Sequence, residues 1–320
     1  MPNVFHGRSA RLCGQLESTF RTAPASPAGL VVPFTTLDFG REPNRVDDGT
    51  MNGEPLANRR DETDSQTSGS LNSILDLHSI GFWLALLWGR PTTTSSSDGK
   101  YKHVFTCTLA ERPSALLALS YNRERFHRFL GTVVNQMSWN IVEAEQNLTV
   151  NLMGGAEVLP RPTASWNDSA PIYQKARACA KGGQVFDTDG SSTLGDISAA
   201  SVQITNDFEG QMLADGNEGP GYFLLGQPAI TGTLSGLFKG SGLTDIARAN
   251  ETRPLSLISR NADRSAVMTL RLPYAEFDEP KQSIQSPRGI VHEIGYRAYG
   301  IAGGDRPTIT LENSVASYGS

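Results

Sequence analysis

The sequence is poor in the features that mark several common protein classes, and cysteine is the first of them. Its 320 residues hold only Cys13, Cys107 and Cys179, which lie far apart and show no CxxC spacing. An odd, sparse set of this kind argues against a disulfide framework and against a zinc site. The first twenty residues also lack the continuous apolar stretch of a secretory signal. We therefore expect a soluble polypeptide that is made in the cytoplasm.

Long apolar runs are missing as well. The most apolar stretch, residues 77–89 (LHSIGFWLALLWG), is shorter than the roughly twenty residues that a membrane-spanning helix needs. We expect no contact with a membrane. Apolar side chains recur in this stretch at spacings of three and four, which predicts a short helix buried in the protein. These side chains are Ile80, Trp83, Leu84, Leu87 and Trp88. Asp76 or Ser79 is a suitable start for the helix, and Gly89 is a suitable end.

Positive charge is not in excess. The formal net charge is −5, which gives no overall electrostatic basis for binding nucleic acid. Residues 122–129 (NRERFHRF) are a local exception, because arginines and phenylalanines together can clamp or stack on nucleic acid. They follow the strand-like run 114–121, so we expect them at a hairpin tip or a sheet edge. In an acidic protein we favour a contact with an acidic neighbouring subunit over nucleic acid.

No arrangement typical of catalysis or metal binding is visible. The five histidines are scattered, without an HExxH motif or a carboxylate at ligand spacing: His6, His78, His103, His127 and His292. Residues 187–190 (DTDG) suggest a calcium loop, but Ser198 stands where that loop needs a glutamate, so we interpret them as a turn. Glu143 and Glu145 lie too close along one strand to act as the two carboxylates of a glycosidase. We predict no enzymatic activity, no cofactor site and no metal site.

The sequence is rich in residues of turns and strands. Its 32 glycines and 18 prolines favour a mainly β fold. We expect an extended N-terminal arm at 1–29, a β-rich domain at 30–155, a linker or insert at 156–200, and a second β-rich domain at 201–320. Within the first domain, the polar stretch 41–70 carries Asp-Gly and Asn-Gly turn signals. It is either a surface loop with a function or a long exposed hairpin.

The second domain repeats features of the first in the same order, about 160 residues later, which predicts a duplicated domain. The apolar helix corresponds to residues 243–249 (LTDIARA), and four strand-like segments have counterparts. The pairs are Ser68–Leu71 with Thr231–Leu234, Ser114–Leu117 with Ser265–Met268, Gly131 with Gly289, and Leu148–Val150 with Ile309–Leu311. The alternative is that β meanders resemble one another by chance.

The order of several short motifs resembles the tail tube proteins of long-tailed bacteriophages. In the second half these are SVQITNDFEG, QPAITGTLSGLF, LRLPYAEFDE, SPRGIVHEIGYRAYG and ITLEN. In the first half they are VVPFTTLDFG, SGSLNSILDLHSIGFWLALLWG, and the YKHVF and PSALLALSYN strands. The match covers about residues 30–155 and 200–314, and it leaves out residues 187–196.

This resemblance implies two tandem tail-tube-type domains, each a β-sandwich or half-barrel with one short flanking helix. It implies a structural virion protein whose copies form rings, which stack into a tail tube through which DNA passes without specific binding. Two fused domains would make the ring a trimer with pseudo-sixfold symmetry. The tape-measure protein and other tail proteins would be its partners, and the tail would be assembled in the host cytoplasm. The alternative is a β-sandwich binding module of the tail tip or baseplate, or an adhesin.

Overall fold

The structure is a computed structural model of the chain. It describes residues 6–51, 53, 55–56, 58–96, 98–141, 145–186, 197–214, 216–237, 247–248, 251–279 and 291–318. Large antiparallel sheets dominate the described residues, consistent with a β-sandwich, and α1 is the one α-helix whose bounds lie entirely within them. The predicted mainly β fold class is therefore confirmed.

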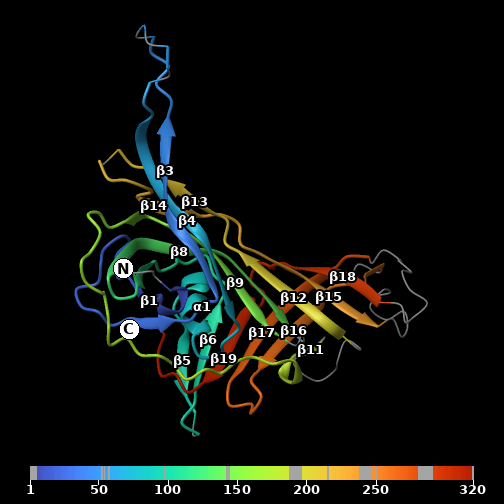
Figure 1. Cartoon of the computed structure of the whole chain (residues 1–320). Helices are drawn as coiled ribbons and strands as arrows, with labels where there is room; N and C mark the ends of the chain where they lie inside the picture. The colour runs from blue at the N-terminus through green and yellow to red at the C-terminus, as the bar shows by residue number, and fades with distance from the viewer. Residues whose placement is uncertain are drawn as a thin grey trace.

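The described residues of the first half form ten strands, the α-helix α1 and a 3₁₀ turn, and Figure 1 shows their arrangement. Their bounds are η1 Gly7–Ser9, β1 Arg11–Leu16, β2 Leu30–Val32, β3 Thr36–Val46, β4 Asp61–Ile74, α1 Ile80–Trp88, β5 Thr92–Ser95, β6 Tyr101–Thr106, β7 Ala115–Tyr121, β8 Arg125–Ile141, β9 Asn147–Gly154 and β10 Ala156–Glu157.

In the second half, the elements with bounds within the described ranges are nine further strands and a 3₁₀ turn. Their bounds are η2 Ala180–Gly182, β11 Gln184–Phe186, β12 Ile197–Thr205, β13 Phe208–Gln211, β14 Tyr222–Leu225, β15 Ala229–Leu237, β16 Arg253–Arg260, β17 Val267–Phe277, β18 Val291–Ala298 and β19 Thr308–Asn313.

Strand β8 belongs to both layers of the structure. Its first part pairs with β7 and β10, and β7 continues the layer to β1 and β2. Its second part pairs with β9 and β12 in the larger layer. Gly131 lies between the two parts with φ +65°, and a Cβ atom there would come within 2.9 Å of the Phe20 ring. Only glycine fits this conformation and this space, so Gly131 allows the strand to pass from one layer to the other.

Helix α1 lies inside the wrapped strands (Figure 1), and all nine of its residues are buried. The predicted short buried helix is thus confirmed, but it is apolar on every side rather than on one face, as expected for a helix enclosed by protein. Asp76 begins it by accepting a hydrogen bond from the Ser79 backbone N–H at 2.9 Å. At the other end, the buried Asn206 amide donates to the Leu87 carbonyl at 2.9 Å. These side chains satisfy helix-end groups that have no partner within the helix.

The N-terminal segment differs from the expected extended arm. Within residues 1–29, β1 pairs with β7 over its whole length and is buried from Leu12 to Leu16. Burial of these apolar side chains fixes the segment in the sheet.

The described part of residues 156–200 is also fixed to the folded body, so it is not a free linker. Beyond β10 and β11, Asp76 and Arg177 form a β-bridge, and so do Ala178 and Asn261. Ala170 and Trp166 pack on Cys13 and its apolar neighbours. The segment therefore lies against the body of the protein. Residues 187–196, with the suspected calcium turn, lie outside the described residues.

The two halves of the chain share strand pairing and core. Strand β12 pairs with β8, and β19 pairs with β6, so both junctions join one half to the other. One hydrophobic cluster runs from Leu12 to Tyr318. The pairing also differs between the halves, since β4 pairs with β9 whereas its proposed counterpart β15 pairs with β18. The duplicated two-domain division stays a prediction, and its second helix, 243–249, lies largely outside the described residues.

Candidate assembly surface

The β3–β4 hairpin projects from the body of the protein, as Figure 1 shows. Its ladder is antiparallel from Thr36↔Asn72 to Val46↔Asp61, and the five outermost residues of β3 are exposed. The polar stretch 41–70 is therefore a long exposed hairpin, the second of the two forms that the sequence allowed. In the described pairings β3 has no partner other than β4, and it carries Pro43, a residue suited to an edge strand.

The hairpin apex, residues 46–56, combines apolar and acidic character. Met51 is fully exposed and Leu56 is 81% exposed. The apex contains Asp47 and Asp48, and Asp47 pairs at 2.6 Å with Arg60, which follows the apex in the same loop.

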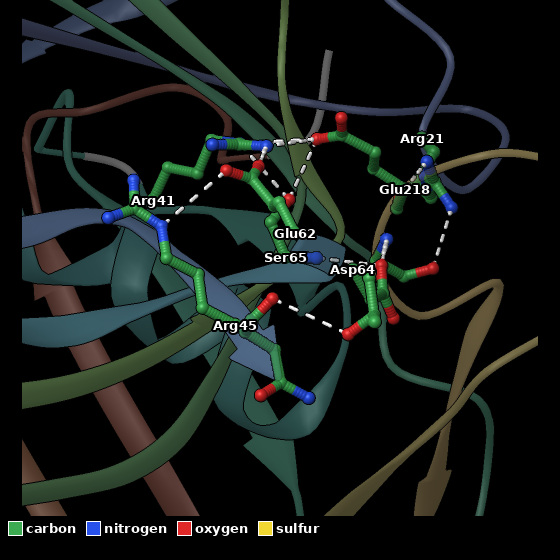
Figure 2. Close-up of polar contacts among 10 residues, drawn as sticks. Arg21, Arg41, Arg45, Glu62, Asp64, Ser65 and Glu218 are labelled. Atoms are coloured by element: carbon green, nitrogen blue, oxygen red, sulfur yellow. Dashed lines mark hydrogen bonds and ion pairs between the residues drawn. The ribbon is translucent and has the colours of Figure 1, made fainter. Parts of the chain in front are cut away.

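A polar cluster holds the base of the hairpin, and we call it the clasp (Figure 2). Arg41 on β3 is its centre: it pairs with Glu62 on β4 and, at 2.8 Å, with Glu218 from the segment between β13 and β14. The Ser65 hydroxyl also donates to Glu218 at 2.8 Å. Hydrogen bonds from Arg41 hold the pKa of the Glu218 carboxyl below its ordinary value. Glu218 thus accepts from both strands of the hairpin.

The backbone around Glu218 is held as closely as its side chain. The Asp64 carboxylate accepts from the Gly219 N–H at 2.9 Å. Gly219 has φ +77°, and a Cβ atom on it would lie 1.9 Å from the Gly155 carbonyl oxygen. This contact requires glycine, so the segment packs directly on the sheet beneath the hairpin.

Arg21 closes the clasp from the other side, as Figure 2 shows. Its guanidinium donates to the Glu218 carbonyl at 2.6 Å and to the Pro220 carbonyl at 3.0 Å. The buried Glu17 carboxylate in turn accepts from the Arg21 N–H at 3.1 Å and from the Gly131 N–H at 3.0 Å. Burial raises the pKa of Glu17 above its ordinary value, although these donors oppose the shift. The clasp therefore connects the hairpin to β8 at Gly131, where this strand passes from one layer to the other.

Strands β13 and β14 form a separate two-stranded sheet beside the clasp, which we call the ribbon. One face packs inward through Phe223, whose ring meets that of Phe20 edge-on at 5.7 Å. The other face exposes Tyr222 (44%) and Leu224 (49%) to solvent. A two-stranded sheet is marginal by itself, so these contacts and the clasp are what hold it in place.

Residues 122–129 lie at a hairpin tip, as predicted. The turn 122–124 joins β7 to β8, and Asn122 takes a positive φ. Much of the cluster is engaged within the chain, however. His127 meets Glu157 at 2.8 Å, and the Arg128 guanidinium lies 5.0 Å from the centre of the Trp166 ring. Only the turn and Arg125 are exposed, and a contact of this tip with an acidic neighbouring subunit stays a prediction.

The other candidate side chains do not converge on one site. His103 is buried between Thr93 and the Val315 carbonyl, and burial lowers its pKa. His78 contacts the Gln174 carbonyl, and His6 is exposed near the N-terminus. The side chain of His292 and all of Glu143 lie outside the described residues, while Glu145 pairs with Arg177. Among the described residues, no group of three or more His, Cys, Asp or Glu is placed to hold a metal ion.

Sequence reasoning missed the clasp and the ribbon. Arg21, Arg41 and Glu218 are far apart in the sequence, and no local pattern connects them. The alternation of Tyr222 to Leu225 was the one available signal, because it places two apolar side chains on the exposed face of a short strand.

Comparison with known families gives one match that covers most of the chain. The family described as phage tail tube protein matches residues 7–298. No curated protein matches the chain. None of the described helices has the length and apolar character needed to cross a bilayer.

Proposed function

This chain belongs to the phage tail tube protein family, and we propose that its copies assemble into stacked rings that form the tube of a phage tail. The tube would serve as the channel for DNA ejection into the host. The family match over residues 7–298 is the observation that carries this proposal. A structural protein of the virion tail needs no catalytic site, and we assign none.

The exposed strand edges support assembly. In the described pairings β3 has only β4 beside it, and β5 has only β6. An open edge presents unpaired N–H and C=O groups that pair readily with another chain. Closure of the sheets across neighbouring copies satisfies these edges, and a closed ring limits the association that free edges would otherwise allow.

The projecting hairpin supports stacking. A contact between two different surfaces of the same protein repeats without closing and so builds an open filament. We propose that the β3–β4 hairpin bridges successive rings in this way. The N-terminal segment 1–29 is a weaker candidate for bridging, because β1 is part of the folded body.

We propose a ring of three chains with pseudo-sixfold symmetry, because the sequence repeat suggests two tube-type units in each chain. The tape-measure protein and other tail proteins are the proposed partners, and the host cytoplasm is the proposed place of assembly. Native mass spectrometry of isolated rings would distinguish three chains from six.

The acidic balance of the chain suits a DNA channel. A lumen through which DNA slides should repel phosphate groups rather than release their counterions and bind them. A net charge of −5 is compatible with such a lumen. We therefore propose that DNA passes through the tube without specific binding.

Electron microscopy of the purified chain tests the proposal. We expect hollow tubes of uniform diameter. Discrete monomers at all protein concentrations would contradict it and would favour the alternative, a β-sandwich module of the tail tip, the baseplate or an adhesin that binds through a single exposed site.

A further inference from the structure

The segment that follows β19, residues 314–318, lies against the start of α1, and we call it the strap. Its anchor is Tyr318, which is buried. The Tyr318 hydroxyl donates to the His78 carbonyl at 2.5 Å. The Tyr318 ring lies so close to the helix that a Cβ atom on Gly81 would come within 2.4 Å of it. The strap therefore depends on a glycine in the first turn of α1.

Asn313, the last residue of β19, holds the strap closed. Its fully buried amide donates to the Leu77 carbonyl and to the Tyr318 hydroxyl, both at 2.7 Å. Its side-chain oxygen accepts from the Val315 N–H at 2.9 Å. Two of these three partners belong to the strap. Because a buried polar group without a partner is costly, Asn313 favours the closed position of the strap.

The strap also covers His103 on β6, which is fully buried. The Val315 carbonyl can only accept a hydrogen bond, so Nε2 of His103 carries a proton and donates to it at 2.8 Å. The Thr93 hydroxyl lies 2.8 Å from Nδ1 and can donate to it. The Tyr318 ring meets the imidazole edge-on, with ring centres 4.8 Å apart. These contacts satisfy both nitrogens of the neutral imidazole.

The surroundings of His103 offer nothing to balance a positive charge. Helix α1, strand β5 and the strap contain no charged residue. The titratable rings in contact with the imidazole are those of Tyr101 and Tyr318, and burial raises the pKa of Tyr318 above its ordinary value, so it stays neutral. Asp76, which lies near Tyr318, already accepts from two backbone N–H groups. Two charged residues on β6 and β19 are exposed, and strand alternation places them on the opposite face: Lys102 and Glu312.

We propose that the strap is an acid-sensitive latch, in which protonation of His103 favours release of residues 314–318 from the start of α1. A second proton on the imidazole would put an unbalanced charge into a site that the closed strap shields from water. Opening the strap returns this charge to solvent. The latch is a property of the single chain and does not depend on assembly into tubes.

The direction of the pH effect follows from linkage. Burial lowers the pKa of His103 below its ordinary value of about 6.5, so the closed form binds fewer protons than the open form. The closed strap is therefore most stable above pH 6.5. It loses stability as pH falls from there through the lowered pKa.

Hydrogen–deuterium exchange of the full chain tests the latch, once the rates are corrected for the intrinsic effect of pH on exchange. From about pH 7.5 to 5.5, protection of the Val315 N–H should fall in wild type, by at most about tenfold for each pH unit, because one proton is linked. His103→Gln keeps an N–H donor for the Val315 carbonyl but cannot gain a proton, so its protection should not change with pH. The matched control is His78→Gln, which removes an imidazole that contacts the Gln174 carbonyl beside the strap and should keep the wild-type fall.

An NMR titration of the His103 imidazole provides the reciprocal test. We expect a pKa below 6.5 in wild type, and Tyr318→Ala, which removes the anchor of the strap, should move this pKa toward 6.5. Wild-type protection that does not fall with pH, or an equal fall in His103→Gln, would overturn the latch. A His103 pKa that Tyr318→Ala leaves unchanged would also overturn it, and this result decides the question if His103→Gln does not fold.

Discussion

At the scale of single residues, Arg41 contacts both Glu62 and Glu218 and so ties the hairpin to the segment before β14. Its side chain is 19% exposed and that of Glu218 is 52% exposed, so screening limits the pair to about 1 kcal/mol or less of stability. The contribution of Arg41 is therefore mainly to fix the position of the hairpin.

We predict that Arg41→Ala makes the hairpin more susceptible to protease while lowering the unfolding free energy by about 1 kcal/mol or less. Limited proteolysis within residues 41–70 is the measurement. The control is Arg45→Ala, which removes only an exposed ion pair at 3.9 Å with Glu62 and should leave cleavage unchanged. Equal cleavage of wild type and Arg41→Ala would show that the clasp does not position the hairpin.

Glu17 gives a prediction about pH. Because burial raises its pKa in the folded protein, its contribution to stability is present below its ordinary pKa of about 4.5 and is lost as pH rises through the raised value. We predict that Glu17→Gln flattens the fall in unfolding free energy between pH 4.5 and neutrality. Denaturant unfolding at several pH values is the measurement, and an unchanged pH dependence in Glu17→Gln would contradict this assignment.

The pKa shift of Glu218 has the opposite sign to that of Glu17, so Glu218 serves as the comparison. Its pKa is lowered by Arg41, so its contribution is present above about pH 4.5 and is lost as pH falls through the lowered value. We expect Glu218→Gln to change the unfolding free energy slightly below pH 4.5. Above pH 4.5, the dependence of the unfolding free energy on pH should stay as in wild type.

At the scale of elements, α1 is the centre of the fold. Leu84 is fully buried in the common core. We predict that Leu84→Ala lowers the unfolding free energy by about 2–5 kcal/mol, the range for deleting a buried leucine side chain. The control, Ile172→Ala, removes an exposed side chain and should change it by less than about 0.5 kcal/mol. A loss below 1 kcal/mol for Leu84→Ala would mean that the core around α1 is poorly packed.

The same elements show how far the sequence alone could go. Helix α1 and the alternating β9 were predictable, because three- and four-residue spacing and strict alternation are local signals. The strand β1 was not, because RLCGQL contains a glycine and polar residues and does not alternate, and its burial comes from the distant β7. The ribbon and the clasp depend on similarly distant partners, so no window of the sequence reveals them.

At the scale of the whole molecule, the β3–β4 hairpin projects from the body of the protein, and we propose that it contacts another copy. We predict that replacing residues 47–60 with Asn-Gly leaves the monomer folded but shortens or abolishes tubes. Val46 and Asp61 are already paired, so a two-residue turn can close the shortened hairpin. Thermal unfolding checks the fold, and electron microscopy measures tube length. Tubes of wild-type length would rule out bridging by the hairpin apex.

The organisation of the two halves is also a property of the whole molecule. Pairing of β8 with β12 and of β6 with β19 joins them in continuous sheets, so a boundary at 156–200 does not separate independent cores. A repeat in the sequence could not reveal this, because cross-strand pairing between distant segments leaves no local pattern.

A cryo-electron microscopy reconstruction of the particles that the purified chain forms tests the proposed assembly most directly. We predict a hollow tube of stacked rings, with three chains in each ring and the β3–β4 hairpin of each chain lying against a copy in the next ring. Solid particles, or chains that remain single with their hairpins in solvent, would contradict it.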